Sequence, residues 1–430
     1  MEKQLFIFLA VLLTLTAQAQ QQPTDSVLPS ALSLNDYRQH VLDYSQELKQ
    51  AKEDISGSDY QRKAAITGYL PQIDLSADVS YDLIASQFAG QTLEPFNYSV
   101  GANLTQNIFA GGTVITQHKM AKTQVQIAEL SEQLTIEEVL YRAEVTYWLA
   151  AATKQYLSNA EAYYRVVKAL FDVVDKRFDD GYVSKSDLLM VNTRLKEAEL
   201  QWNSAKRAAS VAFQNLNILM GTPVDKAIDV TDLIDTELDL PTYKTLDDVL
   251  SIRPEYLLVD KNITKQKQYV SSVYAQYNPM IVGGIKAGWG TPMINLTGES
   301  SFNSTVYASF RFPLLEWGKR SYSARAAKVE VNKLNMEKVR VTDQINSELS
   351  SSWVNLNDNY KQIIIANENL SIAAENMDLN TLRYNEGQLP ILDVLSSQLS
   401  WIQAFNNSVQ AEYNYKVAYA DYKKATGVMQ

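Results

Sequence analysis

The chain has no cysteine among its 430 residues. This absence excludes disulfide bonds, thiolate metal sites, a cysteine nucleophile and a lipid-modified N-terminal cysteine. Histidine is almost as scarce: His40 and His118 lie on helical stretches without partner residues, so neither metal binding nor acid–base catalysis is expected of them. No serine sits in a nucleophile elbow. We therefore predict a protein that is not an enzyme and has no cofactor.

Positive charge is also in short supply. Lys and Arg together number 39 against 49 Asp and Glu, which gives a net charge of −10 and a pI near 5.0. No dense basic cluster is interleaved with aromatic residues. A nucleic-acid partner is therefore not expected.

Long apolar runs are missing as well. The run over residues 5–15 is too short to span a bilayer, which takes about 20 residues, and it ends at Ala17-Gln18-Ala19, where a signal peptidase could cut. We predict a signal peptide over residues 1–19; the alternative is an N-terminal membrane anchor. No later segment approaches about 18 consecutive apolar residues, so a membrane-spanning part would have to be a barrel.

Glycine and proline, the residues that most often break helices, are absent from two stretches of 68 residues, 113–180 and 319–386. Apolar residues recur there at mixed spacings of three and four, which is typical of a coiled coil. At 1.5 Å per residue each helix would reach roughly 100 Å. We predict shorter return helices at 186–220 and 391–426.

The long segments belong to an internal duplication. A constant offset of 206 residues relates three pairs of glycines: Gly112 and Gly318, Gly181 and Gly387, Gly221 and Gly427. Glycines in register over such a distance indicate a repeat. The predicted organisation is a first repeat at 20–221, an acidic connector at 222–245 and a second repeat at 246–430.

Each repeat opens with helix and then has two strand-like stretches, at 72–83 and 97–109 in the first and at 280–290 and 303–314 in the second. Apolar and polar residues alternate over about ten residues, the length that crosses a bilayer when tilted. The alternative is a sheet of a soluble β-sandwich, in which apolar and polar residues alternate in the same way. Aromatic residues at the strand ends favour the membrane interpretation.

Four strands cannot close a membrane barrel, because the smallest barrels have about eight and an open edge in lipid leaves backbone groups unpaired. Several copies must therefore share one barrel. A dimer would give eight strands, a trimer twelve and a tetramer sixteen, and twelve begins to open a passage. Helices of roughly 100 Å would form a tube beyond the membrane. The function that follows is conduction.

Two finer expectations concern the flanking segments. The first helix is predicted from about Ser33 to Gly68, interrupted only at Gly57. The connector at 222–245 is rich in aspartate, which suits a calcium-like site or a solvated linker; no Asp-x-Asp-x-Asp-Gly spacing is present, which favours the linker.

Duplicated short motifs carry a family resemblance. They are Tyr69-Leu70-Pro71 and Tyr277-Asn278-Pro279, Phe109-Ala110-Gly111-Gly112, Arg253-Pro254-Glu255, and the turns Phe178-Asp179-Asp180-Gly181 and Tyr384-Asn385-Glu386-Gly387. The sequence resembles TolC-type outer-membrane efflux proteins over essentially the whole mature chain. The resemblance implies a mixed α/β membrane protein: a homotrimer with a shared 12-stranded transmembrane β-barrel, four strands per protomer, continuous with a helical coiled-coil tunnel in the periplasm. Its expected partners are outer-membrane lipid, a periplasmic adaptor protein and an inner-membrane RND or ABC transporter.

In that family acidic rings close the tunnel at its tip. The resemblance places a ring aspartate at Asp393, whereas Ser396 stands where a second acidic ring is often found. Tyr384 and Asp187 resemble a hydrogen-bonded pair that holds the tip closed, and Leu389 stands where the family can carry an arginine. The alternative for both aspartates is a first-turn residue that satisfies free helix amides.

The same resemblance gives candidate contacts for the adaptor in the two tip turns. They are Gly181, Tyr182, Val183 and Ser184 in the first turn, and Gly387, Gln388 and Leu389 in the second. The alternative is that these are ordinary turn residues.

The predicted function is a passive outer-membrane duct of a tripartite efflux or type I secretion system. Its cargo stays open between small toxic molecules, metal ions and polypeptides. The alternative from another class is an exported coiled-coil scaffold without a pore, which would wash off the membrane with carbonate.

Overall fold

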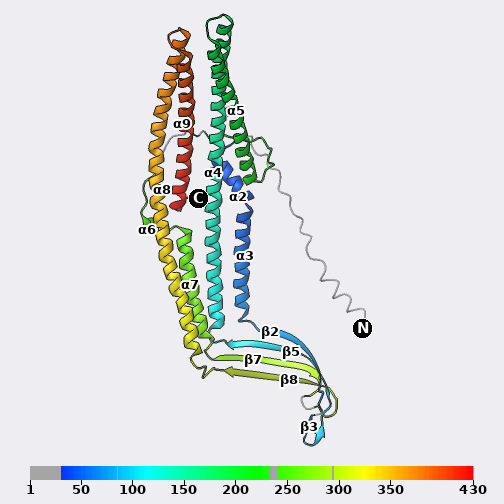
Figure 1. Ribbon diagram of the computed structural model, residues 1–430. Helices are drawn as coiled ribbons and strands as arrows, with labels where there is room; N and C mark the ends of the chain where they lie inside the picture. The colour runs from blue at the N-terminus through cyan, green and yellow to red at the C-terminus, as the bar shows by residue number, and fades with distance from the viewer. Residues whose placement is uncertain (1–30, 85, 233, 235–239, 293–294, 430) are drawn as a thin grey trace, which may run out of the picture.

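The computed structural model describes residues 31–429 except 85, 233, 235–239 and 293–294. Figure 1 shows an elongated molecule with a curved sheet at one end and two helical hairpins at the other. The helices are α2 (Leu34–Tyr44), α3 (Gln46–Thr67), α4 (Thr113–Asp179), α5 (Lys185–Met220), α6 (Leu246–Leu250), α7 (Pro254–Ala275), α8 (Lys319–Asn385) and α9 (Ile391–Ala425). The strands are β1 (Ala31–Leu32), β2 (Gln72–Tyr81), β3 (Gln87–Phe88), β4 (Gln91–Thr92), β5 (Phe96–Phe109), β6 (Asp229–Val230), β7 (Met280–Gly290) and β8 (Ser301–Arg311).

Four strands form one antiparallel sheet in the order β2-β5-β7-β8. Neighbouring rows across the sheet have opposite character, because side chains of successive residues point to opposite faces. One row joins apolar residues from all four strands, Ile73, Leu104, Ile285 and Val306. The next row joins Asp74, Asn103, Lys286 and Thr305. The sheet therefore has one apolar and one polar face.

The apolar face is not covered by any other described part of the chain: Leu75 and Val306 are each 80% exposed. The outer strands β2 and β8 have no further strand beside them in the part of the chain that the structure describes. The sheet thus lacks partners both on one face and along two edges.

The two long helices, α4 and α8, have 67 residues each and begin directly after Gly112 and Gly318, both in the left-handed conformation. Toward the sheet they belong to a layer with the order α3-α4-α7-α8, and toward the tip to one with the order α5-α4-α9-α8. Figure 1 shows α3 and α7 ending near the sheet, whereas α5 and α9 run beside the upper halves of α4 and α8. None of the described helices has an apolar stretch of the length and hydropathy needed to cross a membrane.

The largest apolar cluster lies where these two layers meet. Tyr37 of α2, Tyr147 and Trp148 of α4, and Leu216 of α5 are buried in it. The Tyr147 hydroxyl donates to the carbonyl of Leu32 at 2.9 Å and lies 3.0 Å from an Asp232 carboxylate oxygen. This middle part of the molecule, called the waist below, therefore contains the largest apolar core of the described chain.

The structure corrects the expectation for the first helix. The break falls at Ser45, whose hydroxyl accepts from the amide of Leu48 and so caps α3. Gly57 lies inside α3 and does not end it. A serine that caps a new helix ends the previous one as effectively as a glycine does.

The described part of the connector is more ordered than a plain linker. Its strand β6 pairs in parallel with β1. Asp232 accepts from the amide of Leu34 at 2.7 Å, and Asp229 pairs with Lys154 at 2.6 Å. Asp229 thus fastens β6 to α4, and Asp232 fastens the first residue of α2 to the connector. Within the described residues no group of three His, Cys, Asp or Glu side chains could hold a metal ion; Asp235, Glu237 and Asp239 lie outside them, as does the predicted signal peptide.

Sequence and structure also differ at some element ends. The strand predicted at 303–314 begins at Ser301 and ends at Arg311, and that predicted at 72–83 ends at Tyr81. Helix α5 begins at Lys185, one residue before its predicted start. The long helices end at Asp179 and Asn385, each one residue early.

Candidate functional site at the helical tip

The two tip turns share one backbone geometry. Gly181 and Gly387 each have φ of +78°, a conformation that costs a residue with a side chain about 1–2 kcal/mol. In the first turn the amide of Tyr182 donates to the Arg177 carbonyl at 2.8 Å, and in the second that of Gln388 donates to the Arg383 carbonyl at the same distance. Both turns therefore satisfy the last carbonyls of a long helix in the same way.

The carboxylate of Asp187 is engaged by its own helix. It accepts from the backbone amide of Ser184 at 3.3 Å and from the Ser184 hydroxyl at 2.9 Å, while that hydroxyl accepts from the Asp187 amide. This is a reciprocal capping box at the start of α5. The structure thus gives Asp187 a capping role, and its part in a gate stays a prediction.

Asp393 occupies the equivalent place on α9 but has no such partner. The residue before this helix is Pro390, which has no hydroxyl group, and no side-chain cap is formed. Asp393 is exposed, and no side chain in the described residues pairs with its carboxylate. Its charge is therefore available to ions or to another copy of the chain.

Tyr384 makes contacts other than the predicted one. It is 6% exposed, and its hydroxyl has no hydrogen-bond partner among the described residues. The expected hydrogen bond to Asp187 is not formed, because that carboxylate already caps α5. The Tyr384 ring instead lies 5.0 Å from the guanidinium carbon of Arg177.

Arg177 links the two turns and was not identified from the sequence. Besides its contact with the Tyr384 ring, its guanidinium donates to the carbonyl of Asn385 at 3.4 Å. Its position in the last turn of α4 is an ordinary one for a basic residue. Only the fold, which brings the ends of α4 and α8 together at the tip, indicates the bridging role.

The remaining tip residues divide into packed and exposed ones. Val183 packs against an apolar cluster that includes Val174, Val191 and Ile391 and joins both hairpins. Tyr182 is 82% exposed. Exposed members at the end of the molecule are Gly181, Tyr182, Ser184, Gly387 and Gln388, and Leu389 is half-buried. The end of the molecule therefore exposes the Tyr182 ring, and Leu382 and Leu392 close to the second turn are more than half exposed as well.

A cluster of charged side chains at the waist surrounds Arg253, the first residue of the Arg253-Pro254-Glu255 motif. Arg253 is almost fully buried, donates to Glu255 at 2.8 Å and to Glu348 at 2.9 Å, and caps the end of α9 through the Ala425 carbonyl. Burial acts to lower the pKa of Arg253, but the two carboxylates outweigh it and hold the pKa above its usual value. Arg253 thus fastens α7, α8 and α9 together.

The fold has clear counterparts among solved structures. The outer membrane channel CmeC of Campylobacter jejuni superposes with a TM-score of 0.79 over 92% of this chain and 85% of that one, at 18% identity. The MtrE outer membrane channel of Neisseria gonorrhoeae, solved in its open state, gives 0.76 over 92% and 88%, at 16% identity. The chain therefore has the fold of these solved outer membrane channels.

Sequence comparison gives the family. A model of the outer membrane efflux protein family matches residues 37–222 and 246–428, which are most of the chain. The outer membrane efflux protein BepC of Brucella suis biovar 1 (strain 1330) is 22% identical over 437 residues, covering 98% of this chain and 89% of the relative. The chain belongs to the outer membrane efflux protein family.

Proposed function

We propose that three copies of the chain close a twelve-stranded barrel in the outer membrane and conduct substrates passively through it and through the helical tunnel. The sheet is the observation that carries this proposal. Its apolar face is exposed and its edge strands β2 and β8 are free in the described chain. Lipid would cover the face, and neighbouring copies would pair with the edges.

The helical layer supports the same assembly. Helices α5 and α8 lie at the two sides of the tip layer and carry large apolar side chains that no described residue covers. These include Leu200, Val211 and Ile218 on α5, and Val354, Ile365 and Ile372 on α8. Apolar side chains of this number on outer helices indicate packing against another protein surface. In a closed trimer, α5 of one copy would face α8 of the next.

Disulfide trapping tests the closure, since the chain has no native cysteine. One cysteine replaces Ala77 on β2, and a second is scanned over positions 303–309 on β8. Covalent dimers and trimers are expected at one or two β8 positions. As a control, the second cysteine replaces Ala287 on the central strand β7, where only monomers are expected. Monomers at every β8 position, together with no conductance in planar bilayers, would contradict the proposal.

The partners belong to the proposal as well. A tunnel that conducts passively needs a driven supplier, so we place a periplasmic adaptor and an inner-membrane RND or ABC transporter below the tip, with the helices in the periplasm. The exposed turn residues Tyr182 and Gln388 and the adjoining Leu389 support docking there. We further assign Asp393, and with it Tyr384 at the turn, to the gate that narrows the tip; Asp187 would act there only by fixing the turn.

Photo-crosslinking from Tyr182 and from Leu389 in cells tests the docking site. Capture of a periplasmic adaptor, identified by mass, is the expected result. A crosslinker at Tyr243, which is exposed at the waist, serves as the control and should not capture the same protein. Equal capture from Tyr243 would contradict docking at the tip while leaving the channel itself intact.

A further inference from the structure

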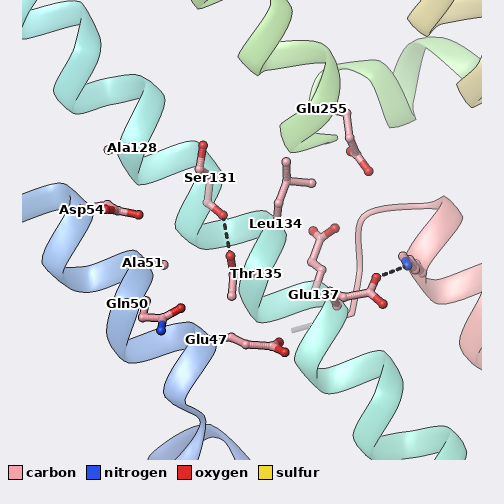
Figure 2. Close-up of a pocket in the computed structure, with 12 residues that line it drawn as sticks. Glu47, Gln50, Ala51, Asp54, Ala128, Ser131, Leu134, Thr135, Glu137 and Glu255 are labelled. Atoms are coloured by element: carbon pink, nitrogen blue, oxygen red, sulfur yellow. Dashed lines mark hydrogen bonds and ion pairs between the residues drawn. The ribbon is translucent and has the colours of Figure 1, made fainter. Parts of the chain in front are cut away.

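A cavity of about 560 Å³ lies at the waist between α3, α4, α7 and the end of α9. Its size is within the roughly 300–1,000 Å³ range of pockets for small molecules. Figure 2 shows side chains of α3 and α4 facing each other across it, with Glu255 of α7 at one side. Its lining includes the carboxylates Glu47, Asp54, Glu137, Glu138 and Glu255.

Glu137 is the unusual member of this set. Its side chain is 3% exposed, lines the cavity, and has no hydrogen bond or ion pair within the described residues. Burial, and then the charge of Glu255, raise the pKa of Glu137 to about 7, although Arg253 and Lys424 act in the opposite direction. The Glu137 carboxyl group is therefore open to a ligand in the cavity that would supply hydrogen bonds or a positive charge.

The charges around the cavity are only partly balanced. Three of the five carboxylates have partners: Glu47 pairs with Arg142, Glu138 with Lys424 and Glu255 with Arg253. Glu137 on α4 and Asp54 on α3 have none among the described residues. The cavity therefore has two carboxylates without a basic partner among the described residues, one on α3 and one on α4.

Apart from the charged residues, the lining combines apolar and polar groups. Ala51, Ala128 and Leu134 supply the apolar groups, which suit a short carbon chain, and Gln50, Ser131 and Thr135 supply the polar ones. No described group of three acidic or histidine side chains could hold a metal ion directly. The lining therefore favours an organic cation over a bare metal ion.

We propose that this cavity binds an organic dication of the diammonium type, with one ammonium group at Glu137 and the other at Asp54. The ligand would bridge α3 to α4 beside the ion pairs that fasten α7 and α9. This inference is independent of conduction, because none of these residues belongs to the sheet or to the tip.

Binding of 1,5-diaminopentane to the purified full chain in detergent tests the proposal by titration calorimetry. At about pH 8 the diamine should bind about tenfold more tightly than n-pentylamine, which has a single ammonium group. At about pH 6 the preference should largely disappear, because protonation of Glu137 removes one of the two charges. Glu47, Glu138 and Glu255 retain their basic partners at both pH values.

Variants separate the site from general attraction of cations by an acidic protein. Glu137→Gln and the exposed Asp54→Asn should each weaken diamine binding about tenfold. Glu53→Gln, an exposed change on α3 outside the lining, should leave it unchanged. The proposal is overturned if the diamine binds no better than the monoamine at about pH 8, or if Asp54→Asn binds like the wild type. A planar-bilayer recording on the same samples reports conduction separately.

Discussion

The two tip turns have the same backbone but use their aspartates differently. Each long helix ends in the same glycine turn, and an aspartate follows six residues after the glycine in both, at Asp187 and Asp393. In the first turn Ser184 supplies a hydroxyl and draws Asp187 into a capping box. In the second, Pro390 takes the place of that serine and Asp393 remains without a cap partner.

The difference shows how a duplicated chain can divide its tasks. A single change at the residue before the helix decides whether the aspartate stabilises the turn or stays available for ions. A similar contrast appears about a third of the way along the long helices. Glu137 is buried at the waist, whereas Asp343, which lies 206 residues later, is exposed.

The largest expected effect comes from removing the buried carboxyl group of Glu137, whose counterpart in the second repeat is exposed. Between its ordinary value of 4.5 and about 7, folded Glu137 keeps a proton that the unfolded chain releases, so the free energy of unfolding falls as pH rises through this range. Glu137→Gln should remove this loss and raise stability at about pH 8 by up to about 3 kcal/mol, with no gain at about pH 4. Thermal unfolding followed by circular dichroism measures it.

Asp343→Asn is the matched control for that experiment, because the second repeat leaves its carboxylate in solvent. It should change the unfolding temperature very little at either pH. An equal stabilisation by both variants would show that net charge, and not burial, is responsible.

The second prediction tests the division between the two tip aspartates. Asp393→Ala should raise the concentration of a trivalent cation that half-blocks conductance by about tenfold, because carboxylates that converge on a pore axis bind cations. Asp187→Ala should change it less than about twofold, since its carboxylate serves the helix end. Single-channel recording with hexaamminecobalt measures both. The reverse order would assign the gate to the first turn.

The third prediction concerns what the turns share. Gly181→Ala and Gly387→Ala should each destabilise their own tip by about 1 kcal/mol, because both glycines have φ of +78° and no neighbouring atom near the added methyl group. Local hydrogen exchange of the flanking helix ends measures the cost. If one substitution destabilises its tip much more than the other does, the two turns do not have the common geometry described above.

The smallest expected effect comes from making the second turn resemble the first. Pro390→Ser should allow a capping box with Asp393, stabilise the start of α9 by about 0.5 kcal/mol, and weaken cation block about twofold. Pro390→Ala removes the ring without adding a hydroxyl and serves as the control. If both variants weaken block equally, the proline itself and not the free carboxylate sets the cation affinity.

Much of the architecture could be predicted from local patterns. The absence of glycine and proline from two stretches predicts the long helices, and the alternation of apolar and polar residues predicts the four strands. The constant offset of 206 residues between glycine pairs predicts the repeat. Each of these signals can be recognised from residues in sequence, without knowledge of which distant segments touch. The tip glycines are identified for the same reason. The fold class and the family follow from these elements and their motifs.

Features that depend on distant contacts could not be predicted. Arg177 meets Tyr384 only because the ends of α4 and α8 come together at the tip. Glu137 is buried only because α7 and α9 approach it from positions more than a hundred residues later. The hydrogen bond expected between Tyr384 and Asp187 failed because a nearer partner, Ser184, competes for the carboxylate. The capping contact within α5 forms in place of the contact between residues far apart in the sequence.

The free edges β2 and β8 also bear on inheritance and biogenesis. If every copy completes its neighbours' hydrogen bonds, no copy can enter the bilayer alone, and insertion becomes a collective step whose rate rises steeply with the amount of chain made. A variant with one damaged edge would then disable the normal copies with which it assembles. Such a variant would act dominantly in cells that also produce the wild-type chain.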